Sequence, residues 1–189
     1  MSIIEEEPWP TRDAELTARL AAAPDRLLHR WMCECVEHAI ETCLPLSQPA
    51  GYFLLPETTP IEVKRRWLAG EATDADLERA QYHGVKECYW GNPIALGAAI
   101  LGVAWYPGSG IAVAEDEHYA ESMTYHPSAA AAACDVMSEC LEAVMDMALR
   151  ACHEWEDRGA ASEMFDRTAD AERAWQRERF FAMCREAGC

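Results

Sequence analysis

A chain of 189 residues is long enough to bury one sizeable hydrophobic core without help from disulfides or a structural metal. Half of its residues are apolar, and alanine is abundant while β-branched residues are sparse, which favours helix over strand. The 33 acidic and 16 basic residues give a formal net charge of -17, which disfavours binding to nucleic acid or to an anionic membrane and favours a basic protein partner.

The start of the chain differs in composition from the rest. Residues 1–11 carry three Glu and two Pro, and we expect them to form an arm that is loose or becomes ordered on docking. Because this segment has neither a basic region nor an apolar stretch, it does not fit a signal peptide, and we expect a cytoplasmic protein with reduced thiols. The longest apolar run, residues 93–107, is too short to span a bilayer.

Seven helices are predicted from the spacing of apolar residues and from the residues that begin and end helices. They cover residues 12–23, 25–43, 59–70, 73–89, 94–105, 128–158 and 169–187. Residues 45–59, with three prolines and a glycine, are predicted to be a loop, and residues 111–125 a long loop with one short helix. Short turns between amphipathic helices indicate antiparallel packing. We therefore predict an all-α protein, a single domain over residues 1–189 that forms a compact antiparallel bundle of about six or seven helices.

Two of the predicted helices carry recognisable signals at their N-termini. Thr59 and Pro60 fit an N-cap residue followed by a proline in the first turn. Thr73, followed three residues later by Asp76, fits an approximate capping box, in which the acidic side chain serves the backbone at the start of the helix.

The segment over residues 94–105 is apolar nearly all round, which predicts a buried helix. Gly97 and Gly102 within it are expected to let neighbouring helices approach closely. Four tryptophans lie on apolar helix faces and are predicted to belong to the core, namely Trp67, Trp105, Trp155 and Trp175.

The side chains that most resemble a metal-binding set are Cys33, Cys35 and His38. On a helix the two cysteines lie about 200° apart, so they cannot share a tetrahedral ion. We therefore expect packed thiols and no metal. Nine Cys and six His offer many chance pairs for catalysis, but no nucleophile sits on a glycine elbow. We predict no cofactor and no enzymatic activity.

Candidate partner-binding residues are aromatic and acidic. Tyr89 and Trp90 lie at the end of a predicted helix, and exposed aromatic side chains are favoured anchors in interfaces. Glu115, Asp116 and Glu117 form a compact acidic run in the segment whose structure is hardest to predict. We predict that these five residues bind the partner.

Several short motifs are shared with a known family. They are Cys35-Val36-Glu37-His38-Ala39, Cys43-Leu44-Pro45-Leu46, Arg66-Trp67-Leu68-Ala69-Gly70-Glu71, Asp76-Leu77-Glu78-Arg79-Ala80, the alanine-rich run from Ser128 to Ala133, and Glu172-Arg173-Ala174-Trp175-Gln176. The chain resembles, in these motifs, the fifth numbered family of immunity proteins of bacterial polymorphic toxin systems. The resemblance covers stretches near residues 31–80 and 128–180, whereas residues 88–127 depart from it. It implies an α-helical protein that neutralises a cognate toxin, with no catalytic residues.

Three functions are compatible with these features. The first is an acidic protein that neutralises a toxin by direct binding, its surface covering a basic cleft such as that of a nuclease. The second is a helical scaffold or adaptor subunit of a larger assembly, with the N-terminal arm docking on a partner. The third is an enzyme or metalloprotein that uses Cys and His. The charge favours the first function.

Overall fold

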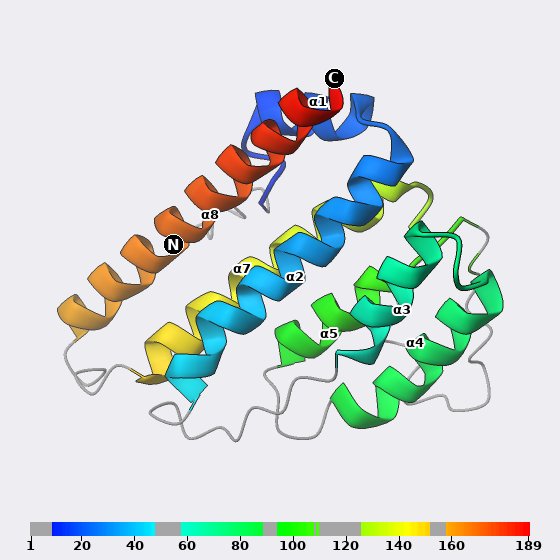
Figure 1. The fold of residues 1–189 in the computed structure, drawn as a ribbon. Helices are drawn as coiled ribbons and strands as arrows, with labels where there is room; N and C mark the ends of the chain where they lie inside the picture. The colour runs from blue at the N-terminus through cyan, green and yellow to red at the C-terminus, as the bar shows by residue number, and fades with distance from the viewer. Residues whose placement is uncertain (1–8, 48–57, 89–93, 108, 110–125, 152–157) are drawn as a thin grey trace.

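The computed structural model describes residues 9–47, 58–88, 94–107, 109, 126–151 and 158–189. Within these ranges all regular secondary structure is α-helical and no strand occurs. The helices are α1 (Ala14–Ala22), α2 (Asp25–Ser47), α3 (Thr59–Leu68), α4 (Asp74–Cys88), α5 (Ile94–Val103), α7 (Ala129–Ala151) and α8 (Arg158–Ala187) (Figure 1). They pack against one another around a common core, so the predicted all-α bundle is confirmed.

The central helix of the bundle is α2. It packs along α7 and also contacts α3, α5 and α8. In Figure 1, α3 and α4 lie on one side of α2 and α8 lies on the other. Its buried side chains recur at helical spacing, as Leu28, Met32, Val36, Ala39 and Cys43 show. Burial of one Leu, Val or Met side chain contributes roughly 1.5–3 kcal/mol, so this continuous apolar face is a main source of stability.

Aromatic side chains fill the contact between α2 and α8. Trp31 of α2 is fully buried and stacks on Trp175 of α8, with the ring centroids 5.7 Å apart. Of the tryptophans predicted in the core, Trp105 is buried, and Trp67 and Trp175 are partly buried. Trp155 lies outside the described residues.

The C-terminal end of α2 differs from the prediction. Pro45 was expected to begin a loop, but α2 continues through it to Ser47. A proline this close to a helix end removes only one backbone hydrogen bond, and Leu46 packs against the core. The Ser47 hydroxyl donates to the carbonyl of Leu44 at 2.8 Å and so satisfies one of the acceptors that a helix end leaves open.

The boundary between the last two helices is also placed differently. The helix predicted over residues 128–158 is described as α7 as far as Ala151, and residues 152–157 lie outside the described ranges. The last helix, α8, begins at Arg158 rather than at residue 169. Residues 160–164 contain two Ala, a Glu and a Met, which are strong helix formers and extend α8 towards its N-terminus. The predicted start of the last helix is therefore wrong, whereas α7 begins as expected, with the Ser128 hydroxyl accepting from the amide of Ala131 at 3.2 Å.

At the start of α4 the hydrogen bonds that the predicted capping box assigns to its acidic residue, Asp76, are confirmed. The carboxylate of Asp76 accepts from the backbone amide of Thr73 at 2.8 Å and from the Thr73 hydroxyl at 2.7 Å. These hydrogen bonds lower the pKa of Asp76 to about 2. At the start of α3 the N-cap residue is Thr58 rather than the predicted Thr59, and Pro60 lies in the first turn as expected.

The short helix α5 packs against α2 and α7 and is buried over most of its length, as predicted. Gly102 is a point of close approach, because a Cβ atom placed there would lie 2.8 Å from Cγ2 of Val136 on α7. None of the helices in the described ranges is both long and apolar enough to cross a membrane.

Replacement of Gly102 by alanine is therefore expected to destabilise the protein, even though alanine is the better helix former. The helix propensity gains about 1 kcal/mol, but forcing a methyl group against a stiff valine costs about 1–3 kcal/mol. We expect the free energy of unfolding to fall by about 1 kcal/mol in urea denaturation. A second substitution, Val136→Ala, removes the opposing methyl group, so the two substitutions should compensate in a double-mutant cycle. Additive effects would contradict this explanation.

Candidate functional site

The residues predicted to bind a partner lie outside the part of the chain that the structure describes. This holds for Tyr89 and Trp90, which follow α4, and for Glu115, Asp116 and Glu117, which lie between α5 and α7. The prediction for these five residues therefore stays a prediction, and a candidate surface is sought among the described helices.

One such surface runs along α7. Asp135, Glu139, Glu142 and Asp146 are spaced by four, three and four residues, so all four carboxylates lie on one side of the helix. We call this set the acidic face of α7. Glu142 is exposed, and the other three are partly exposed. Like charges at this spacing repel, and each such pair destabilises an isolated helix by roughly 0.2–0.5 kcal/mol.

Only the two ends of the acidic face lie beside a basic side chain in the described residues. At one end Nε2 of His126 lies 3.4 Å from Oδ2 of Asp135. At the other end Nε of Arg150 lies 2.8 Å from Oδ1 of Asp146. Glu139 and Glu142, in the middle, form no ion pair with a described residue.

Glu139 shows the electrostatic cost of this arrangement. Its pKa is raised from 4.5 to about 7, first because burial disfavours the charged form and then because Asp135 and Glu142 repel it. A half-buried carboxylate without a cation is unfavourable when ionised, so a basic group brought to this position from outside would be stabilised there.

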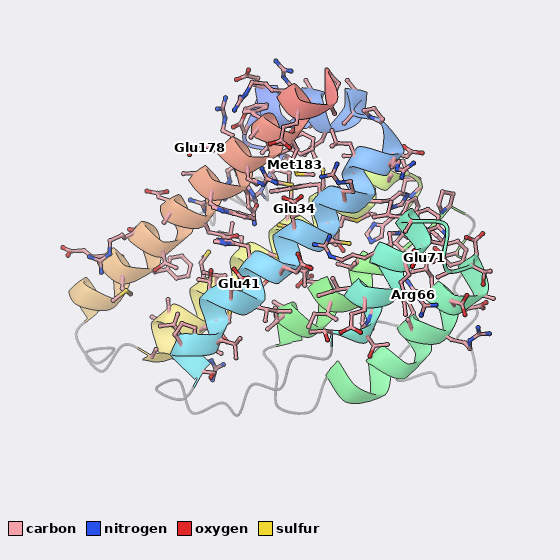
Figure 2. The ribbon with its side chains drawn as sticks, viewed as in Figure 1. Glu34, Glu41, Arg66, Glu71, Glu178 and Met183 are labelled. Atoms are coloured by element: carbon pink, nitrogen blue, oxygen red, sulfur yellow. The ribbon has the colours of Figure 1, made fainter. Side chains whose placement is uncertain are left out.

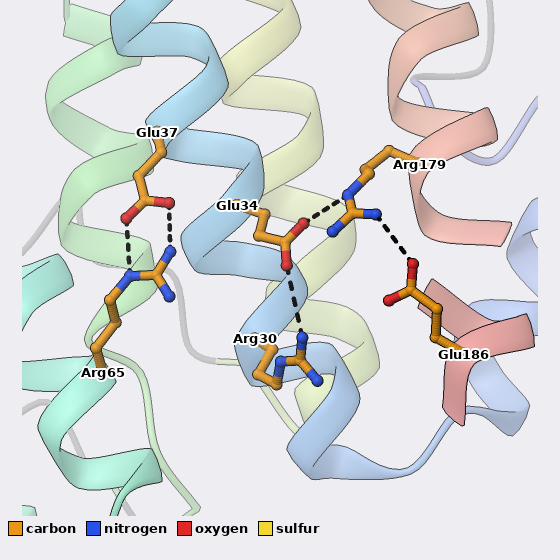
Figure 3. A network of polar contacts seen from close by, with 6 residues as sticks. All are labelled: Arg30, Glu34, Glu37, Arg65, Arg179 and Glu186. Carbon is orange, nitrogen blue, oxygen red and sulfur yellow. Dashed lines mark hydrogen bonds and ion pairs between the residues drawn. The ribbon is translucent and has the colours of Figure 1, made fainter. Parts of the chain in front are cut away.

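Two carboxylates of α2, Glu34 and Glu37, are in the opposite situation, because arginines of neighbouring helices pair with them (Figure 3). Glu37 accepts two hydrogen bonds from Arg65 of α3, one of them 2.8 Å long. Glu34 accepts from Arg179 of α8 at 2.7 Å, and Arg30 lies 3.8 Å away on the other side. These arginines hold α3 and α8 to α2 and are not available to the acidic face of α7. Figure 2 shows the surroundings of Glu34 and Glu41 on α2.

The residues considered as a metal-binding set diverge. Cys33 faces α3, Cys35 faces α7 and His38 faces α8. In the described ranges no group of three or more His, Cys, Asp or Glu side chains is arranged to hold a metal ion. Burial raises the pKa of Cys33 and of Cys43 to about 12, so both thiols stay protonated and are poor nucleophiles.

Sequence reasoning missed a buried cation between α3 and α5. Lys64 of α3 is fully buried, donates to the backbone carbonyl of Trp105, and has its Nζ 4.5 Å from the ring centroid of Trp67. His29 of α2 packs against both tryptophans, at centroid distances of 5.0 Å and 5.6 Å. The spacing of residues in the sequence could have indicated this site, because Lys64 lies three residues after the buried Ile61 and therefore on the apolar side of α3.

A second unpredicted feature is a chain of buried polar groups across α8. The Trp9 indole donates to Oε1 of Gln176 at 2.6 Å, and the Gln176 amide donates to Oε1 of Glu172 at 3.0 Å. Nε2 of His38 lies 3.1 Å from Oε2 of Glu172. Trp9 and the buried Pro10 thus contact the bundle, whereas residues 1–8 of the predicted arm lie outside the described residues.

Glu139→Gln is expected to raise the free energy of unfolding at pH 8 by an amount on the order of 1 kcal/mol. Because the folded-state pKa of Glu139 is raised to about 7, the folded chain binds more protons than the unfolded chain between pH 4.5 and 7. Stability is therefore lost as the pH rises through this window. Urea denaturation at pH 5 and pH 8 checks this, with Glu178→Gln, at an exposed position of α8, as control. A Glu139→Gln variant that gains nothing at pH 8 relative to pH 5 would refute it.

Comparison with models of protein families, with curated proteins and with solved structures found no match to this chain.

Proposed function

We propose that this chain is a non-catalytic binding protein that neutralises a basic protein partner through the acidic face of α7. The observation that carries the proposal is the pair Glu139 and Glu142, two carboxylates in the middle of a continuous acidic row without a cation in the described residues. The resemblance to immunity proteins supports a toxin as that partner, and the net charge of -17 supports fast association with a basic surface.

The physical basis of recognition is charge complementarity in a partly desolvated setting. An Arg or Lys side chain of the partner placed beside Glu139 relieves the repulsion from Asp135 and Glu142. It also restores an ordinary, low pKa to Glu139, so that binding near neutral pH releases a proton. Binding of this kind weakens as the salt concentration rises, because exposed charges are screened.

Co-expression with the products of the genes that flank the native gene tests the proposal. We expect one of these products to be toxic alone and to be tolerated when this chain is present. A variant with Glu139→Gln and Glu142→Gln should lose the protection. A variant with Glu163→Gln and Glu178→Gln, which makes the same change in net charge at exposed positions of α8, should retain it.

Two outcomes would contradict the proposal. If no flanking product is toxic and rescued, the neutralising role is wrong, and a stable multi-subunit assembly isolated from the native host would favour the scaffold alternative. If both double variants protect equally well, the acidic face of α7 is not the contact surface.

A further inference from the structure

A pocket of about 520 Å³ lies where α2, α7 and α8 meet. It is formed by the C-terminal parts of α2 and α7 and by the N-terminal half of α8. Its wall is mainly apolar, with Leu46 from α2, Val144 and Ala148 from α7, and Met164 and Trp175 from α8. This volume lies within the range of pockets that hold small molecules, which is roughly 300–1,000 Å³.

The pocket is separate from the acidic face of α7. Val144 follows Asp135 by nine residues, which places it about 180° around the helix from the first acidic residue. Ligand binding in this pocket therefore does not depend on partner binding at the acidic face of α7.

The inner wall carries an imidazole held in a fixed orientation. The ring of His38 stacks on Trp175 with the centroids 3.5 Å apart and the planes 10° apart. Its Nε2 lies 3.1 Å from the buried carboxylate of Glu172, which also accepts from Gln176.

A guanidinium group also lines the pocket. Arg167 of α8 has Glu163 four residues before it and Asp170 three residues after it, at spacings where helical ion pairs form. Within the described residues its contact is instead with Sδ of Met164, another pocket residue, at 3.5 Å. Asp170 pairs with Arg173. Arg167 therefore lines an apolar pocket without forming an ion pair with these two carboxylates, although the chain has a net charge of -17. A guanidinium group in this position is suited to binding the anionic group of a ligand.

We propose that this pocket binds a small amphipathic carboxylate. The apolar body of the ligand packs against Trp175, Leu46 and the small side chains of α7. Its carboxylate forms a charge-assisted pair with Arg167, and the hydroxyl of Thr168, which also lines the pocket, is a second donor.

Calorimetric titration with decanoate, used below its micelle-forming concentration, tests the proposal, and decanol serves as the neutral comparison. We expect decanoate to bind with one-to-one stoichiometry and to raise the Tm, and decanol to bind about tenfold more weakly, because it lacks the charge-assisted pair. Arg167→Gln should weaken decanoate binding by about the same factor and leave decanol binding unchanged. Arg185→Gln, an exposed arginine near the end of the same helix, is the matched control and should change neither.

The location of binding is tested by closing the pocket. Ala171 is exposed and lines the pocket, so Ala171→Trp places an indole in it without disturbing the core. Ala174 is exposed on the same helix and does not line the pocket, and Ala174→Trp is the control. We expect the first variant to lose decanoate binding and the second to keep it. The proposal is overturned if the unmodified protein binds no decanoate, if decanol binds equally well, or if Ala171→Trp has no effect.

Discussion

Gln176→Leu is expected to lower the free energy of unfolding by about 3 kcal/mol, although leucine has nearly the same volume and is more apolar. Gln176 is fully buried in α8 and makes three hydrogen bonds. It accepts from the indole of Trp9 at 2.6 Å and donates to the backbone carbonyl of Met137 at 3.1 Å and to Glu172 at 3.0 Å. Leucine leaves all three partners without Gln176, and each buried group that loses its partner costs roughly 1–3 kcal/mol.

Urea denaturation of the variant at neutral pH measures this loss. Trp9→Phe removes one of the three hydrogen bonds and is expected to cost about 1 kcal/mol, so it calibrates the larger value. If Gln176→Leu were as stable as the unmodified protein, the polar chain would contribute nothing beyond what apolar packing supplies, which occurs for some buried polar groups.

The second large effect concerns the pH dependence of stability. Burial lowers the pKa of Lys64 from 10.5 to about 7, so the folded chain releases a proton that the unfolded chain keeps until far higher pH. Between pH 7 and pH 9 the Lys64 side chain therefore binds more protons in the unfolded chain than in the folded one, and its contribution to the free energy of unfolding rises with pH. Over two pH units one such group contributes about 2–3 kcal/mol. We expect Lys64→Met to abolish this rise.

The slope of the free energy of unfolding against pH, rather than its value at one pH, tests the assignment to Lys64. Loss of the hydrogen bond to the carbonyl of Trp105 lowers the stability of Lys64→Met by a similar amount at every pH. Arg66→Met, at an exposed position of the same helix, should keep the slope of the unmodified protein. Measurements should stop near pH 9, because burial raises the pKa of Cys33 to about 12, and ionisation of that thiol in the unfolded chain then favours unfolding. Equal slopes for Lys64→Met and the unmodified protein would contradict the assignment.

Features set by local spacing could be predicted from the sequence. The buried helix α5, the hydrogen bonds between Thr73 and Asp76, and the close approach at Gly102 depend on residues within a few positions or on an apolar pattern. The start of α8 at Arg158 could not be predicted, because the residues before position 169 include strong helix formers but no clear start signal.

The pairings between distant helices were beyond sequence reasoning. The sequence placed His38 in a shared motif and in a rejected metal-binding set, but not beside Glu172 and Trp175, which come from the far end of the chain. Lys64 was not singled out, since nothing local shows that α5 places a backbone carbonyl beside its ammonium group. A charged residue on an apolar helix face is the general signal for such sites, but the partner is supplied by the tertiary fold.

The burial of the thiols has a practical consequence for following how the bundle opens. Cys189 is the exposed cysteine among those described, while Cys33 and Cys43 are buried on α2. The thiolate is the nucleophile that attacks an alkylating reagent, so in the native protein the reagent should modify Cys189 first and the other two only after the surrounding helices separate. Cys33 faces α3 and Cys43 faces α7. The modification rate of each thiol, measured from peptide masses, should therefore report separately when α3 and when α7 separates from the central helix.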